Sequence, residues 1–346
     1  MALGSTLAQF LEAEVSGRRV TGDVASTMDC LSKASAELAR IISYSAPAEY
    51  TEDKPAAGSD NHIQRPMDSR AHSLFEAQLL NSPASVLISE EMEEIKGLGG
   101  ESSLCIAIDP LHGSSNMETN MSIGTIFSII EIDRSVLTDP IDAINSGQLL
   151  AAGFFVYGRQ TTLTLTCGNG VSIFSINPAT SEFVLIKQKV CIPRGQREFA
   201  INTSNYRNWD SSVRHFVDDC FSGRDGPLGA DYNMRWNASL VAEAYRILIR
   251  GGVFLYPGDA RQGYEKGRLR LLYEAMPIAF VMEQAGGKAI DGYERILEKK
   301  VTSLHGRIPL IFGSTEMVDQ IGEYFSNDPT ENTRFPLFAS RKLLRN

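Results

Sequence analysis

One continuous stretch, residues 104–130, most constrains what this chain can fold into. It opens with an apolar run over 104–108, which predicts a buried strand, and the carboxylate of Asp109 follows directly. Pro110 has no N–H to donate, so we expect the strand to stop there. Gly113 then allows a tight turn. The pattern therefore predicts a carboxylate at a strand end, followed by a short loop.

The loop after this strand offers groups for both a metal ion and an anion. Ser114 and Ser115 supply hydroxyls and backbone N–H groups, and the apolar run over 123–132 predicts the next strand. Carboxylate oxygens suit a hard metal ion, whereas clustered N–H groups suit a phosphate. A plain turn between two core strands remains an alternative reading of these residues.

Four further acidic residues, Glu90, Glu91, Asp68 and Glu274, stand out in the sequence. The predicted strand 85–88 is followed by Glu90 and Glu91, which repel each other unless a cation lies between them; an exposed acidic turn is the alternative. Asp68 opens a predicted helix over 67–80, where capping is the alternative role. Glu274 lies on an apolar helical pattern, and an unpartnered buried carboxylate costs several kcal/mol. We therefore expect a cation near Glu274.

Composition and charge exclude several classes of protein. A length of 346 residues allows two or three domains at roughly 100–200 residues each. The net charge of −9 disfavours general nucleic-acid binding, which needs a basic face. No apolar run approaches the roughly 20 residues of a membrane span, and no secretory signal is evident. Five dispersed cysteines without a C-x-x-C pair favour a reducing, cytoplasmic location over disulfides or a zinc site.

The order of patterns along the chain predicts an N-terminal α+β domain over 1–195, a C-terminal α/β domain over 196–327 and a tail over 328–346. A turn-rich loop over 46–66 and a linker over 190–197 separate the periodic segments. The remaining predictions are helices over 5–16, 25–43, 67–80, 211–221, 235–250, 269–285 and 316–324, an antiparallel meander over 151–157, 161–166, 171–176 and 182–187, and strands over 253–256 and 308–312.

The string Asp-Pro-Leu-His-Gly-Ser-Ser-Asn at 109–116 resembles the Asp-Pro-Leu-Asp-Gly-Ser-Ser-Asn signature of class 1 fructose-1,6-bisphosphatases, lithium-sensitive and metal-dependent phosphatases. The resemblance spans about residues 15–325 and implies the layered α-β-α-β-α sugar-phosphatase fold, an α+β part followed by an α/β part. The further motifs that carry it are Ser89-Glu90-Glu91, Ile201-Asn202, Arg235-Trp236, Phe-Leu-Tyr-Pro at 254–257 and Gly-Arg-Leu-Arg-Leu-Leu-Tyr-Glu-Ala-Met-Pro at 267–277.

The resemblance also implies an activity: hydrolysis of fructose 1,6-bisphosphate to fructose 6-phosphate, in gluconeogenesis or the Calvin cycle. It implies Mg²⁺, with Mn²⁺ as an alternative, and a homo-oligomer, a tetramer built from two dimers. The implied metal ligands are Glu91, Asp109, the Leu111 carbonyl, His112 and Glu274, and the implied water-activating residues are Asp68 and Glu90. The implied substrate contacts are His112, Gly113, Ser114, Ser115, Asn202, Arg235, Trp236, Tyr256 and Arg268, with Arg235 reaching a neighbouring subunit's 6-phosphate.

This chain departs from the family pattern at several of these positions. His112 stands where the family has a second metal-binding Asp, and imidazole is a softer donor than carboxylate. Arg268 stands where relatives have Lys, and Trp236 where many have Tyr. Two alternatives stay open: sedoheptulose 1,7-bisphosphatase activity, because both sugars present the same two phosphate ends, and a sugar-phosphate-binding pseudoenzyme weakened by His112. Packing for Tyr256 and a surface charge for Arg235 also remain open.

Overall fold

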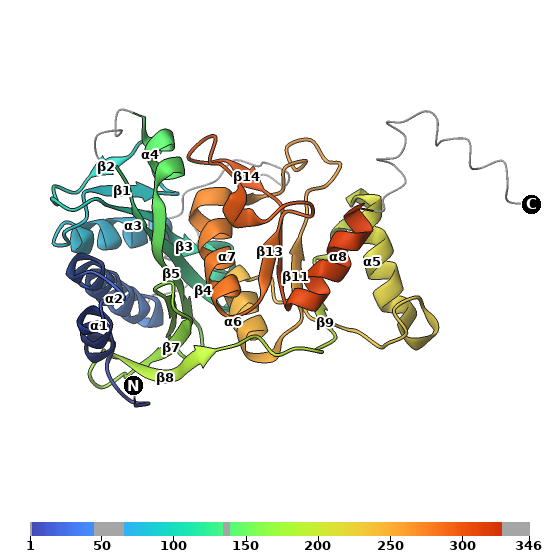
Figure 1. Cartoon of the computed structure of the whole chain (residues 1–346), viewed down its shortest axis with the longest axis horizontal. Helices are drawn as coiled ribbons and strands as arrows, with labels where there is room; N and C mark the ends of the chain where they lie inside the picture. Colours follow the sequence, from blue (N-terminus) through green and yellow to red (C-terminus); the bar gives the residue numbers. More distant parts are fainter. Residues whose placement is uncertain (1, 45–65, 134–138, 327–346) are drawn as a thin grey trace, which may run out of the picture.

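The fold of this computed structural model alternates helices and sheets in five layers (Figure 1). The structure describes residues 2–44, 66–133 and 139–326. The predicted α-β-α-β-α layering is confirmed. All but the last residue of the predicted loop over 46–66, and the whole tail over 328–346, lie outside the described residues.

The first sheet has eight strands in the order β2-β1-β3-β4-β5-β6-β7-β8. β1 and β3 run parallel, while the strands from β3 to β8 pair antiparallel, which confirms the predicted meander. Its strands are β1 (Val86–Ser89), β2 (Lys96–Gly97), β3 (Leu104–His112), β4 (Ile123–Glu131), β5 (Gln148–Tyr157), β6 (Thr162–Thr166), β7 (Val171–Ile176) and β8 (Phe183–Val190).

The prediction that Pro110 ends its strand is wrong. β3 continues to His112, which pairs with Gly124, and the register shifts between Asp109 and His112. A proline is tolerated at such a bulge, because the strand pairing there requires no hydrogen bond from its nitrogen. The Pro110 carbonyl instead accepts a 2.8 Å hydrogen bond from the Thr125 hydroxyl. The bulge keeps Asp109 and His112 on one rigid strand.

The first helical layer consists of α1 (Leu7–Ser16), α2 (Gly22–Tyr44) and α3 (Pro66–Leu79), and confirms the helices predicted over 5–16, 25–43 and 67–80. Apolar residues of these helices pack in one cluster with alternate residues of the sheet, among them Ile106, Ile108 and Phe127. A short helix, α4 (Pro140–Ser146), precedes β5 and is not indicated by the sequence pattern.

The second sheet has five strands in the order β10-β9-β11-β15-β13, and β10, β9 and β11 run parallel. They are β9 (Glu198–Ala200), β10 (Asn233–Met234), β11 (Val253–Tyr256), β13 (Lys288–Ile290) and β15 (Leu310–Gly313). The outer layer over this sheet is formed by α5 (Ser211–Ser222) and α8 (Thr315–Ser326). The strand predicted over 308–312 divides at Pro309 into β14 (Arg307–Ile308), which pairs with β12 (Leu269–Arg270), and β15.

The middle layer consists of α6 (Leu240–Arg250) and α7 (Met276–Gln284), between the two sheets (Figure 1). One apolar cluster joins these helices to both sheets, with Phe154 from the first sheet and Phe312 from the second. Because one core spans both halves, the domain boundary at residue 195 stays a prediction.

Both middle-layer helices begin later than predicted. The helix expected over 235–250 starts at Leu240, because the Ser239 side chain caps it by accepting from the Ala242 N–H. The helix expected over 269–285 divides into β12, a π-helical turn over Leu271–Ala275, and α7. Pro277 has no N–H to donate at the start of α7, which favours an irregular turn before it. Glu274 lies in this π turn, a geometry common at functional sites.

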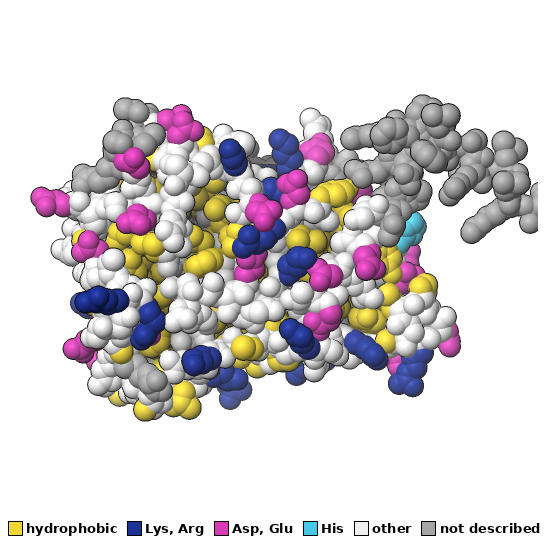
Figure 2. All heavy atoms as spheres, viewed as in Figure 1, with side chains coloured by type: hydrophobic (Ala, Val, Ile, Leu, Met, Phe, Trp, Pro, Cys, Tyr) yellow, Lys and Arg dark blue, Asp and Glu magenta, His cyan; other side chains and the backbone are white. Residues whose placement is uncertain are grey.

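Charged side chains of both signs lie on the surface of the molecule. On the face shown in Figure 2, basic and acidic side chains are interspersed and form no continuous basic patch. Within the described ranges, no helix has both the length and the apolar character that crossing a membrane requires.

Candidate active site

The ends of two neighbouring parallel strands bring the acidic residues together. Ser89 of β1 pairs with Ile108 of β3, so Glu90 and Asp109 follow at the same level of the sheet. The Glu90 N–H donates to the Ile108 carbonyl at 3.0 Å, which extends this pairing by one residue. The carboxylates of Glu90 and Asp109 therefore follow two neighbouring strands at the same edge of the sheet.

A third carboxylate reaches this point from the middle layer. His112 Nδ1 lies 2.9 Å from Asp109 Oδ2 and 3.0 Å from Glu274 Oε1. The backbone N–H of Arg270 donates to the other oxygen of Glu274, at 2.5 Å. Asp109 and Glu274 are both buried. The imidazole of His112 therefore lies between two buried carboxylates, one from each half of the chain.

Burial and charge shift the protonation of this group. Burial alone would lower the pKa of His112, but its hydrogen bonds with Asp109 and Glu274 outweigh burial and raise the pKa well above the ordinary value. Burial also raises the pKa of Glu90 well above its usual range, with the charges of Asp109 and Glu274 adding to the effect. The contacts of His112 with the two carboxylates thus favour its protonated form.

The donor set fits a divalent cation. Asp109, His112 and Glu274 each offer a ligand atom, and these atoms lie within 4.8 Å of one another. Two carboxylates with one imidazole are a mixed oxygen and nitrogen set, which suits Mn²⁺ and Zn²⁺ as well as Mg²⁺. The Leu111 N–H donates to Asp109 Oδ1 at 3.2 Å and orients that carboxylate. Glu91 is next to Glu90 in the same turn, and its N–H donates to Ser89 Oγ at 3.3 Å.

The predicted phosphate loop adjoins these carboxylates. Gly113 adopts a left-handed conformation, with φ of 78°, and starts the 3₁₀ turn Ser114–Thr119. The Ser114 hydroxyl donates to Asp68 Oδ2 at 3.3 Å, while Ser115 is exposed. Asp68 is buried in the first turn of α3, after the helix has begun at Pro66, so the capping interpretation is wrong.

Two of the predicted sugar-contacting residues, Asn202 and Tyr256, lie at the carboxyl ends of neighbouring parallel strands of the second sheet. Ala200 of β9 pairs with Phe254 of β11. Asn202 and Tyr256 stand two residues after these partners, so they lie at the same level of the sheet. The rings of Trp236 and Tyr256 stack with their centroids 6.4 Å apart. Burial raises the pKa of Tyr256, and the nearby Arg268 opposes the shift. The second sheet therefore presents an aromatic surface with a cation beside it.

Comparison with known proteins identifies the family. A sequence model described as "Fructose-1-6-bisphosphatase, N-terminal domain" matches residues 5–188, and one described as "Fructose-1-6-bisphosphatase, C-terminal domain" matches residues 192–326. "Fructose-1,6-bisphosphatase class 1" of Rhodopseudomonas palustris (strain HaA2) is 46% identical over 346 residues, covering 100% of both chains. The chain belongs to the class 1 fructose-1,6-bisphosphatase family.

Other members of the class 1 fructose-1,6-bisphosphatase family show the same likeness. The enzyme so named from R. palustris (strain BisA53) is 48% identical over 324 residues, covering 93% of each chain. The holo-form crystal structure of Leishmania major fructose-1,6-bisphosphatase has a TM-score of 0.84 and 31% identity, and covers 93% of this chain and 99% of that one. The fructose-1,6-bisphosphatase family is metal-dependent, in agreement with the donor set.

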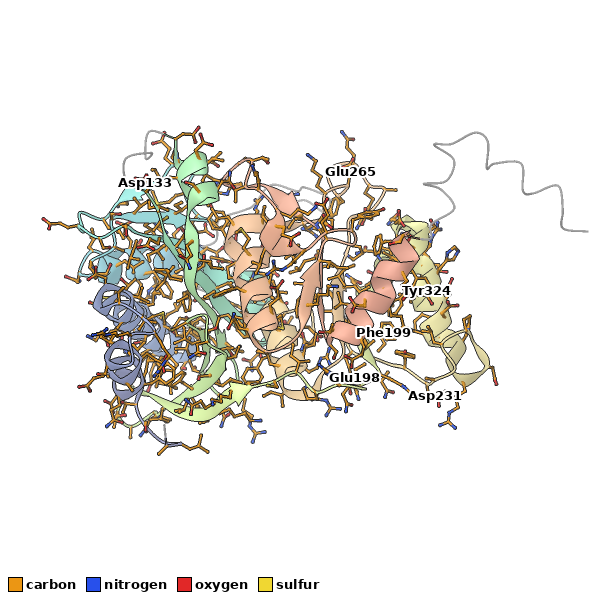
Figure 3. The ribbon with its side chains drawn as sticks, in the orientation of Figure 1. Asp133, Glu198, Phe199, Asp231, Glu265 and Tyr324 are labelled. Carbon is orange, nitrogen blue, oxygen red and sulfur yellow. The ribbon has the colours of Figure 1, made fainter. Side chains whose placement is uncertain are left out.

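Arg235 belongs to a charged cluster that the sequence does not predict. The buried carboxylate of Glu198, at the start of β9 (Figure 3), accepts from Arg246 at 2.9 Å and Arg250 at 2.6 Å. Arg235 Nε lies 3.5 Å from the same carboxylate, and half of its side chain is exposed. Glu198 therefore pairs with a half-exposed arginine, which favours a defined position for Arg235 over a freely moving surface charge.

Arg270 is a second residue that the sequence analysis misses. Its Nε lies 3.4 Å from Glu90 Oε1, and its Nη1 donates to the His305 carbonyl at 3.0 Å. The spacing of four residues between Arg270 and Glu274 could have indicated this position. The Arg270 N–H donates to the Glu274 carboxylate across the π turn. Arg270 supplies a positive charge to the acidic group.

Replacing Glu198 should reveal the strength of this cluster. Glu198→Gln should lower the free energy of unfolding at pH 7 by about 1–3 kcal/mol, because charge-assisted hydrogen bonds are lost. The hydrogen bond with Arg250, foremost among the causes, lowers the pKa of Glu198 in the folded protein. Its contribution is therefore present above the ordinary glutamate pKa and is lost as the pH falls through the lower folded value. Urea unfolding from pH 7 to pH 3 measures this, with the exposed Glu182→Gln as control.

The difference between wild type and Glu198→Gln should therefore shrink toward pH 3. A constant difference over the whole range would show that the carboxylate charge contributes nothing.

Proposed function

We propose that this protein hydrolyses fructose 1,6-bisphosphate to fructose 6-phosphate and inorganic phosphate. One observation carries the proposal: in a chain of the class 1 fructose-1,6-bisphosphatase family, buried carboxylates from both halves converge beside a loop of backbone donors. This arrangement suits phosphate-ester hydrolysis, which needs an activated water and compensation of negative charge on the transferred group.

We propose a divalent metal ion: Mg²⁺, which the family resemblance implies, with Mn²⁺ as the alternative that the imidazole of His112 favours. The residues that would hold it are Glu91, Asp109, His112 and Glu274, with the Leu111 carbonyl. When bound, such ions lower the pKa of coordinated water and compensate the charge of the phosphoryl oxygens.

The chain's own residues account for the remaining chemistry. The backbone of Gly113–Ser115 binds the 1-phosphate. Asp68 and Glu90 take the proton of the attacking water, and the raised pKa of Glu90 suits a group that must hold a proton. The water oxygen bonds to phosphorus, the bond from phosphorus to the sugar oxygen breaks, and that oxygen takes up the proton that the carboxylates removed from the water. Ser114 donates to Asp68 and fixes its orientation.

The distal end of the substrate lies against the second sheet in this proposal. Asn202 and Tyr256 contact the sugar and the 6-phosphate, and the Arg268 guanidinium pairs with that phosphate. Trp236 packs beside Tyr256 and shapes this end of the site. Arg235 extends to the 6-phosphate of a neighbouring subunit.

Phosphate release from two sugar bisphosphates tests the proposal. With Mg²⁺ or Mn²⁺, fructose 1,6-bisphosphate should release phosphate at a rate that depends on the metal. A steady-state comparison with sedoheptulose 1,7-bisphosphate decides between the two substrates, because both present the same two phosphate ends. No release from either sugar with either metal would refute the proposed activity.

His112 favours a second candidate function, a sugar-phosphate-binding pseudoenzyme. Its imidazole lies between the carboxylates of Asp109 and Glu274, where it offsets charge that a metal ion would otherwise offset. Binding of the bisphosphate in calorimetry, together with undetectable hydrolysis, would support this candidate. Turnover at the level of other family members would exclude it.

Restoring a carboxylate at position 112 should raise Mg²⁺-dependent turnover. His112→Asp adds a hard oxygen donor and one negative charge next to Asp109 and Glu274, and removes a competing cation. We expect wild type to prefer Mn²⁺ over Mg²⁺ and His112→Asp to reverse this order. Initial rates against the concentration of each metal measure the effect.

His112→Asn is the matched control, since it keeps a polar side chain but supplies neither charge. If His112→Asp leaves Mg²⁺-dependent turnover unchanged or lower, residue 112 is not a metal ligand in this protein.

We also propose a homo-oligomer, a tetramer of two dimers, because the half-exposed guanidinium of Arg235 is held at the surface by Glu198. Light scattering at micromolar concentration should give a mass of more than one chain, and Arg235→Ala should raise KM more than it lowers kcat. A fully active monomer would contradict the shared site.

A further inference from the structure

One face of α3 follows the acidic site along its length. Asp68, His72 and Glu76 are spaced four residues apart, so their side chains lie one above another on the same face of the helix. Each contacts a different element: Asp68 accepts from Ser114, His72 lies 3.0 Å from Ser89 Oγ, and Glu76 pairs with Lys96. The proposed function uses only Asp68 of these three residues.

The contacts of His72 form a directed chain of hydrogen bonds that ends at Glu91. His72 Nε2 lies 3.2 Å from Glu76 Oε2, so the carboxylate requires the proton on Nε2 and leaves Nδ1 as an acceptor. The hydroxyl of Ser89 can then donate to Nδ1, and its oxygen accepts the Glu91 N–H at 3.3 Å. Ser89 is completely buried, so water cannot replace His72 as its partner.

The other end of the same turn is held by a second histidine. The Met92 N–H donates to the Ser89 carbonyl at 3.1 Å and closes the turn. His305 Nε2 lies 3.0 Å from the Met92 carbonyl and donates to it. The His305 backbone carbonyl in turn accepts from Arg270, the residue beside Glu90. The turn is thus held by α3 on one side and by the segment before β14 on the other.

We propose that His72 and His305 are positioning residues that fix the turn from Ser89 to Met92 and so set Glu90 and Glu91 for cation binding. The inference rests on the proposed function, in which these two carboxylates serve the metal site. Two adjacent carboxylates repel each other, and an unsupported turn would let them separate before a cation binds. Groups that orient metal ligands in this way typically change metal affinity 10–100-fold when they are removed.

Paired variants separate positioning from simple packing. His72→Asn keeps an acceptor near the place of Nδ1, whereas His72→Leu removes it. His305→Gln keeps a donor near the place of Nε2, whereas His305→Phe removes the donor and keeps a ring against Tyr273. His215→Asn, at an exposed histidine of α5, is the matched control.

The measurement is Mn²⁺ binding alone, by titration calorimetry on the full-length metal-free protein, with the melting temperature recorded beside it. We expect His72→Leu and His305→Phe to weaken Mn²⁺ binding by about 10-fold or more. His72→Asn and His305→Gln should recover most of the affinity, and His215→Asn should match wild type. Ser89→Ala combined with His72→Leu should bind no more weakly than the worse single variant, because both remove one connection.

The outcomes distinguish this inference from the proposed function. Wild type that neither binds Mn²⁺ nor releases phosphate would overturn the proposed function and this inference with it. If the wild type binds Mn²⁺ and releases phosphate, and all four variants of His72 and His305 bind Mn²⁺ as tightly as the wild type, the inference alone is overturned. Equal loss of affinity and melting temperature in the Asn, Gln, Leu and Phe variants would show a packing role and would also overturn it.

Discussion

Buried negative charge is the constraint on which the rest of this structure depends. Asp109 and Glu274 are both buried, and each has an oxygen within 3.0 Å of His112 Nδ1. Burial raises the pKa of Glu90, and the charges of these two carboxylates raise it further. Carboxylates removed from water are stable only when hydrogen bonds or cations offset the loss of solvation. The N–H of Leu111, in the bulge of β3, donates to Asp109, and the N–H of Arg270, before the π turn, donates to Glu274. The Arg270 side chain lies beside Glu90.

The fold meets this constraint by joining strand ends. Parallel pairing of β1 with β3 brings one pair of acidic residues to a common level, and parallel pairing of β9 with β11 does the same for Asn202 and Tyr256. The middle layer then brings Glu274 to the first group and packs against both sheets. The proposed metal site and the proposed sugar site are therefore both built from the carboxyl ends of parallel strands.

The sequence predicts much of this architecture, and its failures have physical causes. Alternation and apolar runs locate the meander and the strand before Asp109, because one-sided or complete burial leaves a clear pattern. Proline misleads at Pro110, where a bulge removes the need for its N–H, and the π turn around Glu274 looks helical because its residues are apolar. Asp109, His112 and Glu274 lie together in the structure, and their role as metal ligands stays a prediction. The contacts of Glu198, Arg270, His72 and His305 could not be predicted, since each joins segments far apart in the chain.

The shared middle layer has a consequence for how the two halves communicate. Glu274 belongs to the turn that leads directly into α7, and α7 packs between the sheets, whereas Asp109 and His112 belong to β3 of the first sheet. A sliding of one sheet against the other by the width of a single atom would lengthen the 3.0 Å contact between His112 and Glu274 beyond hydrogen-bonding range. The hydrogen bond between His112 and Glu274 therefore depends on the alignment of the two halves, and a movement of one half against the other would break it.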